Sequence, residues 1–201
     1  MPKSKEQFEK IKEERKASIL DSALYLFAMH GYDAVSSDDI TKHAGCSHGL
    51  LYHYFKSKDE LFNAVLNDVA KTKYLEIVGD TDITKSPKEF LHDLLSSYLN
   101  ALSSNRDDYV CTIYLLLNVH LQKKILPKVI EPKTQKPFII FSSIHDAIEE
   151  GKKCGQFYDN DTREMTIAIL ACLKGLSFTR MYLGDEFVCP SVDIFMRMIT
   201  K

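Results

Sequence analysis

Apolar residues recur along this chain with the spacing of α-helices. Near the N-terminus they fall, close to the 3.6-residue period, at Phe8, Ile11, Ile19, Ala23, Leu26 and Phe27. Gly31 follows this run, and glycine is the usual residue just after a helix. The pattern therefore predicts one long helix over about residues 5–30.

The next segment breaks into short helices, each opened by a serine. Ser36, Ser47 and Ser57 are good N-caps, and Glu60 completes a Ser-x-x-Glu box after the third serine. Three caps within about twenty residues do not fit one continuous helix or a strand. After the third cap, an amphipathic pattern predicts a helix over about residues 58–78.

The rest of the chain also reads as helical. Ser86 is a cap, Pro87 takes the first helical position and Glu89 the third, which predicts a helix start. Further apolar patterns predict helices over about 87–103, 107–122, 137–153, 161–184 and 190–199. No alternating strand pattern or internal repeat is present. We therefore expect an all-α fold of about nine helices.

Composition narrows the class of protein. Of 201 residues, 45% are apolar and 27% charged, which is typical of a globular chain and not of a disordered one. The longest apolar run noted, residues 110–122, is too short for a membrane span, and the charged N-terminus lacks a secretory signal. We expect a cytoplasmic protein without membrane association. Five widely spaced cysteines without a Cys-x-x-Cys motif predict reduced thiols.

Charge and motifs bear on function. The net charge of −2 predicts no general affinity for nucleic acid, but residues 40–58 contain no Asp or Glu and carry three lysines and three histidines. His43, His48 and His53 do not share one helical face, so no metal site is expected. The chain has no Gly-x-Ser-x-Gly, phosphate loop or His-Glu-x-x-His motif. We therefore expect no enzyme activity and no cofactor.

Residues 36–55 predict two short helices joined by a tight turn at Gly45-Cys46-Ser47. This is the architecture of a helix-turn-helix, whose second helix fits the major groove of DNA. Ala44 is small where the helices approach each other. Ile40, Leu51 and Phe55 are expected to pack inward and hold the angle between them.

The outward face of the second helix then carries the chemistry. With Leu51 inward, the side chains expected to face solvent are those of His48, Gly49, Tyr52 and His53. Tyrosine and histidine bond phosphates or base edges. The N–H groups of the first turn, capped by Ser47, also bind phosphate. Lys58 opens the following helix and suits a phosphate contact.

These residues carry a resemblance to a known family. The matching positions are Ile19-Leu20, Ala23, Leu26-Phe27, Gly31-Tyr32, Ser36-Ser37, Asp39-Ile40, Ala44-Gly45-Cys46-Ser47, Gly49-Leu50-Leu51-Tyr52-His53-Tyr54-Phe55, Lys56-Ser57-Lys58 and Leu61. Over residues 15–66 the chain resembles the N-terminal DNA-binding domain of TetR-family transcriptional regulators. The resemblance implies a helix-turn-helix domain at 1–57, a linking helix at 58–78, and an effector-binding and dimerisation domain at 79–201.

The resemblance also implies roles in DNA binding. Phosphate or backbone contacts are expected from Ser36, Ser37, Tyr52 and Lys58, and a backbone or base contact from His53. Ser47 and Gly49, placed at the start of the second helix by the residues themselves, complete the DNA-binding candidates. His48 and Leu50 stand where sequence preference varies most within the family. Two positions depart from it: Leu50 replaces a frequent threonine, so an apolar or thymine-methyl contact is expected, and Cys46 replaces a common valine. We interpret Cys46 as buried, with a redox role as the less favoured alternative.

In the C-terminal domain, two sets of residues are candidates. Those expected to line an effector pocket are Tyr98, Cys111, Tyr114, Asn118, His120, Phe141, His145 and Phe178. Those expected at a dimer seam, with an internal core as the alternative, are Met165, Ile169, Cys172, Leu176, Phe195 and Ile199.

Together these features predict a homodimeric repressor that binds a near-palindromic operator in double-stranded DNA. A hydrophobic or planar small-molecule effector is expected to release it. The alternative is a DNA-binding protein of the same fold without small-molecule control, acting through a protein partner or structurally.

Overall fold

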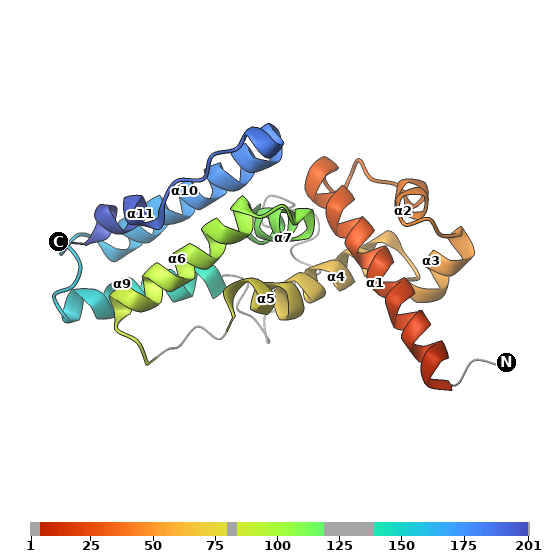
Figure 1. Cartoon of the computed structure of the whole chain (residues 1–201), viewed down its shortest axis with the longest axis horizontal. Helices are drawn as coiled ribbons and strands as arrows, with labels where there is room; N and C mark the ends of the chain where they lie inside the picture. Colours follow the sequence, from red (N-terminus) through yellow and green to blue (C-terminus); the bar gives the residue numbers. More distant parts are fainter. Residues whose placement is uncertain (1–4, 80–83, 119–138, 201) are drawn as a thin grey trace. The chain divides into compact units, whose positions relative to one another are not determined.

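The computed structural model describes residues 5–79, 84–118 and 139–200. Contacts divide the chain into two compact units, Met1–Lys71 and Thr72–Lys201. Counting the interrupted helix of residues 58–78 once, the described residues form nine helices, and their only β structure is one isolated bridge between Phe157 and Thr200. Figure 1 shows the labelled helices in chain order. The all-α prediction is confirmed.

The N-terminal unit packs three helices against a long one. Helix α1 (Lys5–His30) contacts α2 (Ser37–His43) and α4 (Lys58–Asp68), and α2 contacts α3 (His48–Tyr54). Phe27 and Phe62 meet edge to face with ring centres 5.0 Å apart in the core. Such aromatic packing fixes α4 against α1.

All three predicted serine caps are present. Ser36 and Asp39 form a reciprocal capping box, and Ser47 and Ser57 each accept a hydrogen bond from the N–H three residues on. The prediction for Glu60 was wrong in one detail: its carboxylate accepts from the N–H of Lys56 over 2.8 Å and not from that of Ser57. The carboxylate thus ties the helix start to the preceding loop.

The predicted linking helix is continuous but irregular. After α4 comes a π-helical segment, Val69–Lys73, and then α5 (Tyr74–Val78). A π segment adds a residue to one turn and is frequent at functional positions of helices. The boundary between the two compact units, between Lys71 and Thr72, falls within this segment.

The C-terminal unit is organised around α6 (Pro87–Ser103). This helix contacts α5, α7 (Asp107–Asn118), α9 (Ile139–Lys153), α10 (Thr162–Leu183) and α11 (Val192–Ile199). A 3-10 turn, η3 (Gly184–Glu186), follows α10. The predicted helix ends that fall on described residues agree closely with these bounds. The ends predicted at residues 122 and 137 lie, with the three prolines between residues 119 and 138, outside the described residues.

One glycine in this unit has a packing role that the sequence pattern does not reveal. A Cβ at Gly151 of α9 would lie 2.2 Å from ring carbons of Phe157. Phe157 is fully buried, so its ring takes the place that a side chain at residue 151 would need.

Candidate nucleic-acid interface

The turn between α2 and α3 is built from local hydrogen bonds. Gly45 has a φ of +60°, a conformation that glycine adopts without strain. The N–H of Cys46 then bonds the carbonyl of Thr41 over 3.0 Å. Ile40, Leu51 and Phe55 are buried as expected and hold the two helices together. The geometry is a helix-turn-helix.

The outward face of α3 carries the expected side chains. His48, Gly49, Tyr52 and His53 are exposed, Tyr52 to 49% of its surface, and Leu50 is partly buried. The rings of His48 and Tyr52 are stacked, with centres 6.4 Å apart. The structure therefore brings polar aromatic groups together on the surface that a groove would meet.

Two of these side chains are fastened to the start of α2. The Tyr52 hydroxyl donates to the hydroxyl of Ser37 over 3.3 Å. The Nε2 atom of His48 lies 3.1 Å from a carboxylate oxygen of Asp38. Sequence reasoning missed Asp38, which lies in the first turn of α2.

The cap serines are already engaged. The Ser36 hydroxyl donates to the carboxylate of Asp39 over 2.5 Å, and the hydrogen bonds from Ser36 lower the pKa of Asp39. The Ser47 hydroxyl accepts from the N–H of Leu50 over 3.2 Å. Both hydroxyls therefore form hydrogen bonds within their own helix starts. The other N–H groups of each first turn have no partner within the helix and are available to an anion.

Lys58 has a different environment from the one expected. Its ammonium group donates to the carbonyls of Tyr32 and Val35 over 2.9 and 2.8 Å, and lies 4.2 Å from the centre of the Tyr32 ring. The ring hydroxyl in turn bonds Asp59. Lys58 thus ties the α1–α2 loop to α4, and at most one of its three N–H groups remains for a phosphate.

The other polar residues of this region have structural partners. His43 stacks on Tyr25 with ring centres 5.2 Å apart, and His53 meets Tyr54 edge to face. Among the described residues, no three His, Cys, Asp or Glu side chains lie where they could share a metal ion. Cys46 is partly buried, and burial raises the pKa of its thiol, which disfavours the reactive thiolate.

The effector-pocket candidates differ widely in how deeply they are buried. Tyr98 and Cys111 are fully buried, and burial raises the pKa of the Cys111 thiol to about 12. Those that are partly buried are Tyr114, Asn118, Phe141 and His145. Phe178 is 62% exposed on α10, so its assignment to the lining of an internal pocket was wrong. His120 lies outside the described residues.

Among the described residues, the hydroxyl of Thr112 on α7 has no hydrogen-bond partner, and that of Tyr98 on α6 has only the hydroxyl of Tyr74 beside it. Both side chains are fully buried. The pKa of Tyr98 is raised well above its ordinary value, chiefly by burial and secondly by the neighbouring Tyr74 of α5. Thr112 was missed because threonine in an apolar helix usually bonds its own backbone.

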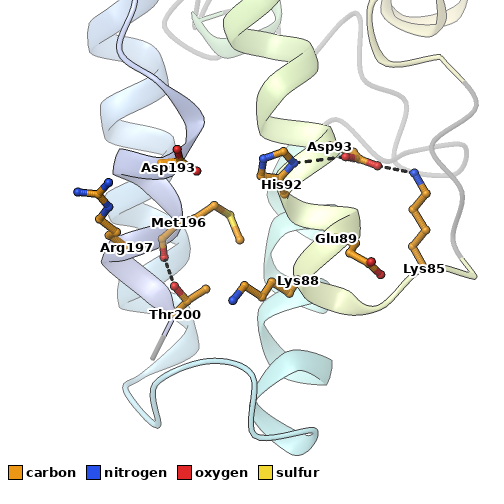
Figure 2. Close-up of a pocket in the computed structure, with 9 residues that line it drawn as sticks. All are labelled: Lys85, Lys88, Glu89, His92, Asp93, Asp193, Met196, Arg197 and Thr200. Carbon is orange, nitrogen blue, oxygen red and sulfur yellow. Dashed lines mark hydrogen bonds and ion pairs between the residues drawn. The ribbon is translucent and has the colours of Figure 1, made fainter.

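An open groove lies elsewhere in the C-terminal unit. It runs between the start of α6 and α11, holds about 550 Å³, and has Met196 among its lining residues (Figure 2). Lys85, His92 and Asp93 are joined there by ion pairs. None of the effector-pocket candidates lines this groove.

The dimer-seam assignment was largely wrong. Met165, Ile169, Phe195 and Ile199 are buried within their own chain, Leu176 is partly buried, and only Cys172 is exposed. The internal core, the alternative considered, holds for the four buried residues. The large apolar side chains that α10 and α11 expose are instead Ile167, Phe178, Tyr182, Leu183, Ile194 and Met198.

Helix α10 is also unusually apolar for its exposure. Among the described residues, Thr162–Glu186 is the one stretch long and apolar enough to cross a membrane by length and composition. Only 22% of its most apolar window is buried within the chain. The sequence reading placed the longest apolar candidate at residues 110–122 and did not single out this stretch.

Comparison with known proteins agrees with this geometry. Residues 19–65 match the family described as bacterial regulatory proteins, tetR family. The chain is 27% identical to YhgD of Bacillus subtilis, an uncharacterized HTH-type transcriptional regulator, over 82% of this chain and 83% of that protein. It is 32% identical to the HTH-type transcriptional repressor KstR2 of Mycobacterium tuberculosis over 48% of each chain.

A solved structure shows the same fold over most of the chain. It is that of a TetR-like transcriptional regulator from Rhodococcus sp. RHA1, with a TM-score of 0.67 and 23% identity. The match covers 92% of this chain and 90% of the other. The helix-turn-helix geometry and the matching residues 19–65 lead to one conclusion: the chain carries a DNA-binding domain of the tetR family of bacterial regulatory proteins.

Proposed function

We propose that this regulator is a homodimeric repressor that a small-molecule effector releases from a near-palindromic operator. The observation that carries the DNA-binding part is the exposed edge of His48 and Tyr52 on α3, held by Asp38 and Ser37 of α2. Relatives named as repressors, including KstR2 and AcnR, support the direction of regulation. We place its action in the cytoplasm, where bacterial DNA is found.

DNA binding divides into two kinds of contact. Ser37, Tyr52 and His53 contact phosphates, which position the protein on any sequence. His48 and Leu50 face base edges and select the sequence, Leu50 through a thymine methyl group. The first-turn N–H groups of α2 and α3, capped by Ser36 and Ser47, add phosphate contacts, and Gly49 allows close approach.

The homodimer rests on the outer faces of α10 and α11. Phe178 and Tyr182 of α10 expose 62% and 81% of their surfaces, and Ile194 and Met198 of α11 expose 53% and 42%. Large exposed apolar patches on a globular protein mark interaction surfaces. A two-fold axis through this surface brings the same residues of the two subunits together. A dimer with this symmetry requires a two-fold symmetric operator.

Effector control rests on the buried hydroxyl of Thr112, which has no partner among the described residues, and on that of Tyr98 beside Tyr74. A buried hydroxyl without a partner costs about 1–3 kcal/mol, which a ligand can recover by supplying the missing hydrogen bond. The surrounding core is apolar, so the fitting ligand is hydrophobic or planar with at least one polar atom. The coupling between effector and operator in such systems is about 1–3 kcal/mol.

The linking helix carries the signal in this proposal. Tyr74 of α5 lies beside Tyr98 and directly follows the π segment Val69–Lys73. A ligand that moves Tyr98 therefore acts on the helix that leads to the DNA-binding domain. We retain the functional division into residues 1–57, the linking helix 58–78 and the effector and dimer domain 79–201.

A filled core favours the alternative of DNA binding without small-molecule control. Tyr98 and its neighbours Leu95 and Leu102 are fully buried in a continuous apolar cluster. In that case the groove between α6 and α11 or another surface would receive a protein partner. The two proposals differ in whether a small molecule changes operator affinity.

The test uses the full chain and DNA from upstream of its own gene. Gel-shift titrations at low and physiological salt measure binding, and a library of apolar carboxylates, lactones and phenols is then added. We expect specific binding of a dimer and release by at least one compound, with the release weakened in Tyr98→Phe. Binding that no compound alters would favour the alternative, and absence of any binding by the purified dimer would refute both.

A further inference from the structure

We propose that Asp38 of α2 is a positioning residue that sets the proton position on the His48 ring, and so decides which bases His48 accepts. The proposal rests on the base contact proposed for His48 above. In that function Asp38 only holds the His48 ring in place. Its carboxylate, on the neighbouring helix α2, lies 3.1 Å from Nε2 of His48, the first outward side chain of α3.

The geometry around His48 permits one position for the proton of the neutral ring. The Nε2 atom lies 3.1 Å from an oxygen of the Asp38 carboxylate, which can only accept a hydrogen bond. It also lies 3.5 Å from the hydroxyl oxygen of Thr41. That hydroxyl donates its hydrogen to the carbonyl of Asp38 over 3.0 Å, so it too has only lone pairs to offer. Both neighbours of Nε2 are acceptors, and Nε2 therefore carries the proton.

The other ring nitrogen then determines the readout. In a neutral imidazole protonated at Nε2, the Nδ1 atom is an acceptor. In the major groove the matching donors are the N6 amino group of adenine and the N4 amino group of cytosine. Guanine presents acceptors at N7 and O6 and is disfavoured. Asp38 thereby converts an ambiguous histidine into one that selects amino groups.

Neighbouring contacts keep the ring in this orientation. The ring of Tyr52 stacks on that of His48 with an angle of 24° between their planes. Tyr52 is itself held by its hydrogen bond to Ser37, the residue before Asp38. The side chains of His48 and Asp38 are 52% and 84% exposed, so the pair lies on the surface. Both groups stay largely hydrated, and the desolvation cost of bringing them together is therefore small.

Asp38 has a simpler possible role as an acid in the first turn of a helix, where it favours helix formation. That role makes a different prediction. Removing the charge would then lower the stability of α2 and increase affinity for all DNA sequences equally, because phosphates are no longer repelled. It would leave the ratio of affinities between sequences unchanged.

The test has one readout without DNA and one with it. Long-range ¹H–¹⁵N NMR of the full chain, at a pH of about 8 where a histidine is ordinarily neutral, reports which ring nitrogen of His48 is protonated. Binding to a pool of operator half-sites with one randomised base pair after another reports sequence preference. The variants are Asp38→Ala, Asp38→Asn and His48→Ala. Asp33→Ala serves as the control, since it removes an exposed acid from the α1–α2 loop.

We expect the wild type and Asp38→Asn to show the Nε2-protonated ring, because the asparagine oxygen still accepts. Asp38→Ala should show a mixture, and should lose about three- to tenfold preference at one base pair, the same one that His48→Ala affects. Asp33→Ala should change neither readout. An unchanged ring signal, or a uniform gain in affinity in Asp38→Ala, would overturn the inference. Failure of the wild type to bind DNA would instead refute the proposed function, and the ring signal would still be measured.

Discussion

The ammonium group of Lys58 donates a 2.9 Å hydrogen bond to the carbonyl of Tyr32, the residue over whose ring it also lies. The two residues are 26 positions apart, so this contact joins the start of α4 to the loop after α1. This contact changes the role expected for Lys58. Two of its N–H groups bond carbonyls of the same chain, so the main role of Lys58 is to stabilise the N-terminal unit, and a phosphate contact is secondary.

Lys58→Ala should therefore lower the stability of the N-terminal unit by about 1–3 kcal/mol, since two partly buried carbonyls lose their donor. Urea unfolding of the full chain measures this. Lys56→Ala, at an exposed lysine two residues earlier, should stay within about 0.5 kcal/mol of the wild type. Unchanged stability together with a smaller salt dependence of DNA binding would show that Lys58 is mainly a phosphate ligand.

Tyr52→Phe removes the hydroxyl that bonds Ser37. We expect binding to weaken by about 0.5–1.5 kcal/mol on every DNA sequence alike, because phosphate contacts carry no sequence information. Fluorescence anisotropy on the operator and on unrelated DNA measures the two losses. Tyr54→Phe is the matched control, since the Tyr54 hydroxyl bonds the carbonyl of Lys12 within the unit. A loss confined to the operator would assign Tyr52 to base readout.

Gly45 and Gly49 should respond to alanine in opposite ways. At Gly45 the φ of +60° makes Gly45→Ala unfavourable by about 1–2 kcal/mol although the surrounding space is open. Gly49 lies within α3, so Gly49→Ala should stabilise the free protein by up to about 1 kcal/mol. Thermal unfolding compares them. If Gly49 meets the DNA backbone closely, Gly49→Ala should also bind DNA more weakly despite its greater stability.

Phe178→Glu should convert the dimer into monomers, because it places a charge in the centre of the exposed apolar face of α10. Sedimentation velocity at several concentrations gives the mass. Tyr158→Glu, at a residue 40% exposed outside α10 and α11, is the control and should remain dimeric. A dimer that survives Phe178→Glu would place the interface on another surface.

Acid should weaken the C-terminal unit through Asp108. Burial alone would raise the pKa of Asp108, but the hydrogen bond from Arg106 and the charge of Lys73 hold it below its ordinary value. A carboxylate with a lowered pKa stabilises the folded state above the unfolded pKa of about 3.9, and this stabilisation disappears as pH falls through the folded value. Asp108→Asn should thus be less stable than the wild type at neutral pH, and the difference should narrow below about pH 4.

The control for this comparison is Asp107→Asn, which changes the neighbouring exposed acid of the same helix turn. Urea midpoints at neutral and acidic pH should differ little between this variant and the wild type. A gap for Asp108→Asn that is equal at both pH values would mean that the ion pairs of Asp108 with Arg106 and Lys73 do not stabilise the fold.

The sequence by itself determined the helices and the helix-turn-helix. Helix starts depend on a serine and on residues three positions away, and helix ends depend on glycine, so both are local properties. The positions of Ser47 and Gly45 therefore predicted the turn, and the alternation around Leu51 predicted which face of α3 lies outward. These are the parts of the site that the structure reproduces.

Tertiary structure decided which apolar residues lie inside. Helix α10 is apolar around most of its circumference, so its periodicity does not distinguish the face against α6 from the face toward solvent. For this reason Ile169 was assigned to a surface and Phe178 to an interior, and both were reversed. The partners of Lys58 and His48 and the unpaired hydroxyl of Thr112 likewise depend on groups from other helices and loops. Only the packing of those elements decides whether such groups come within bonding distance.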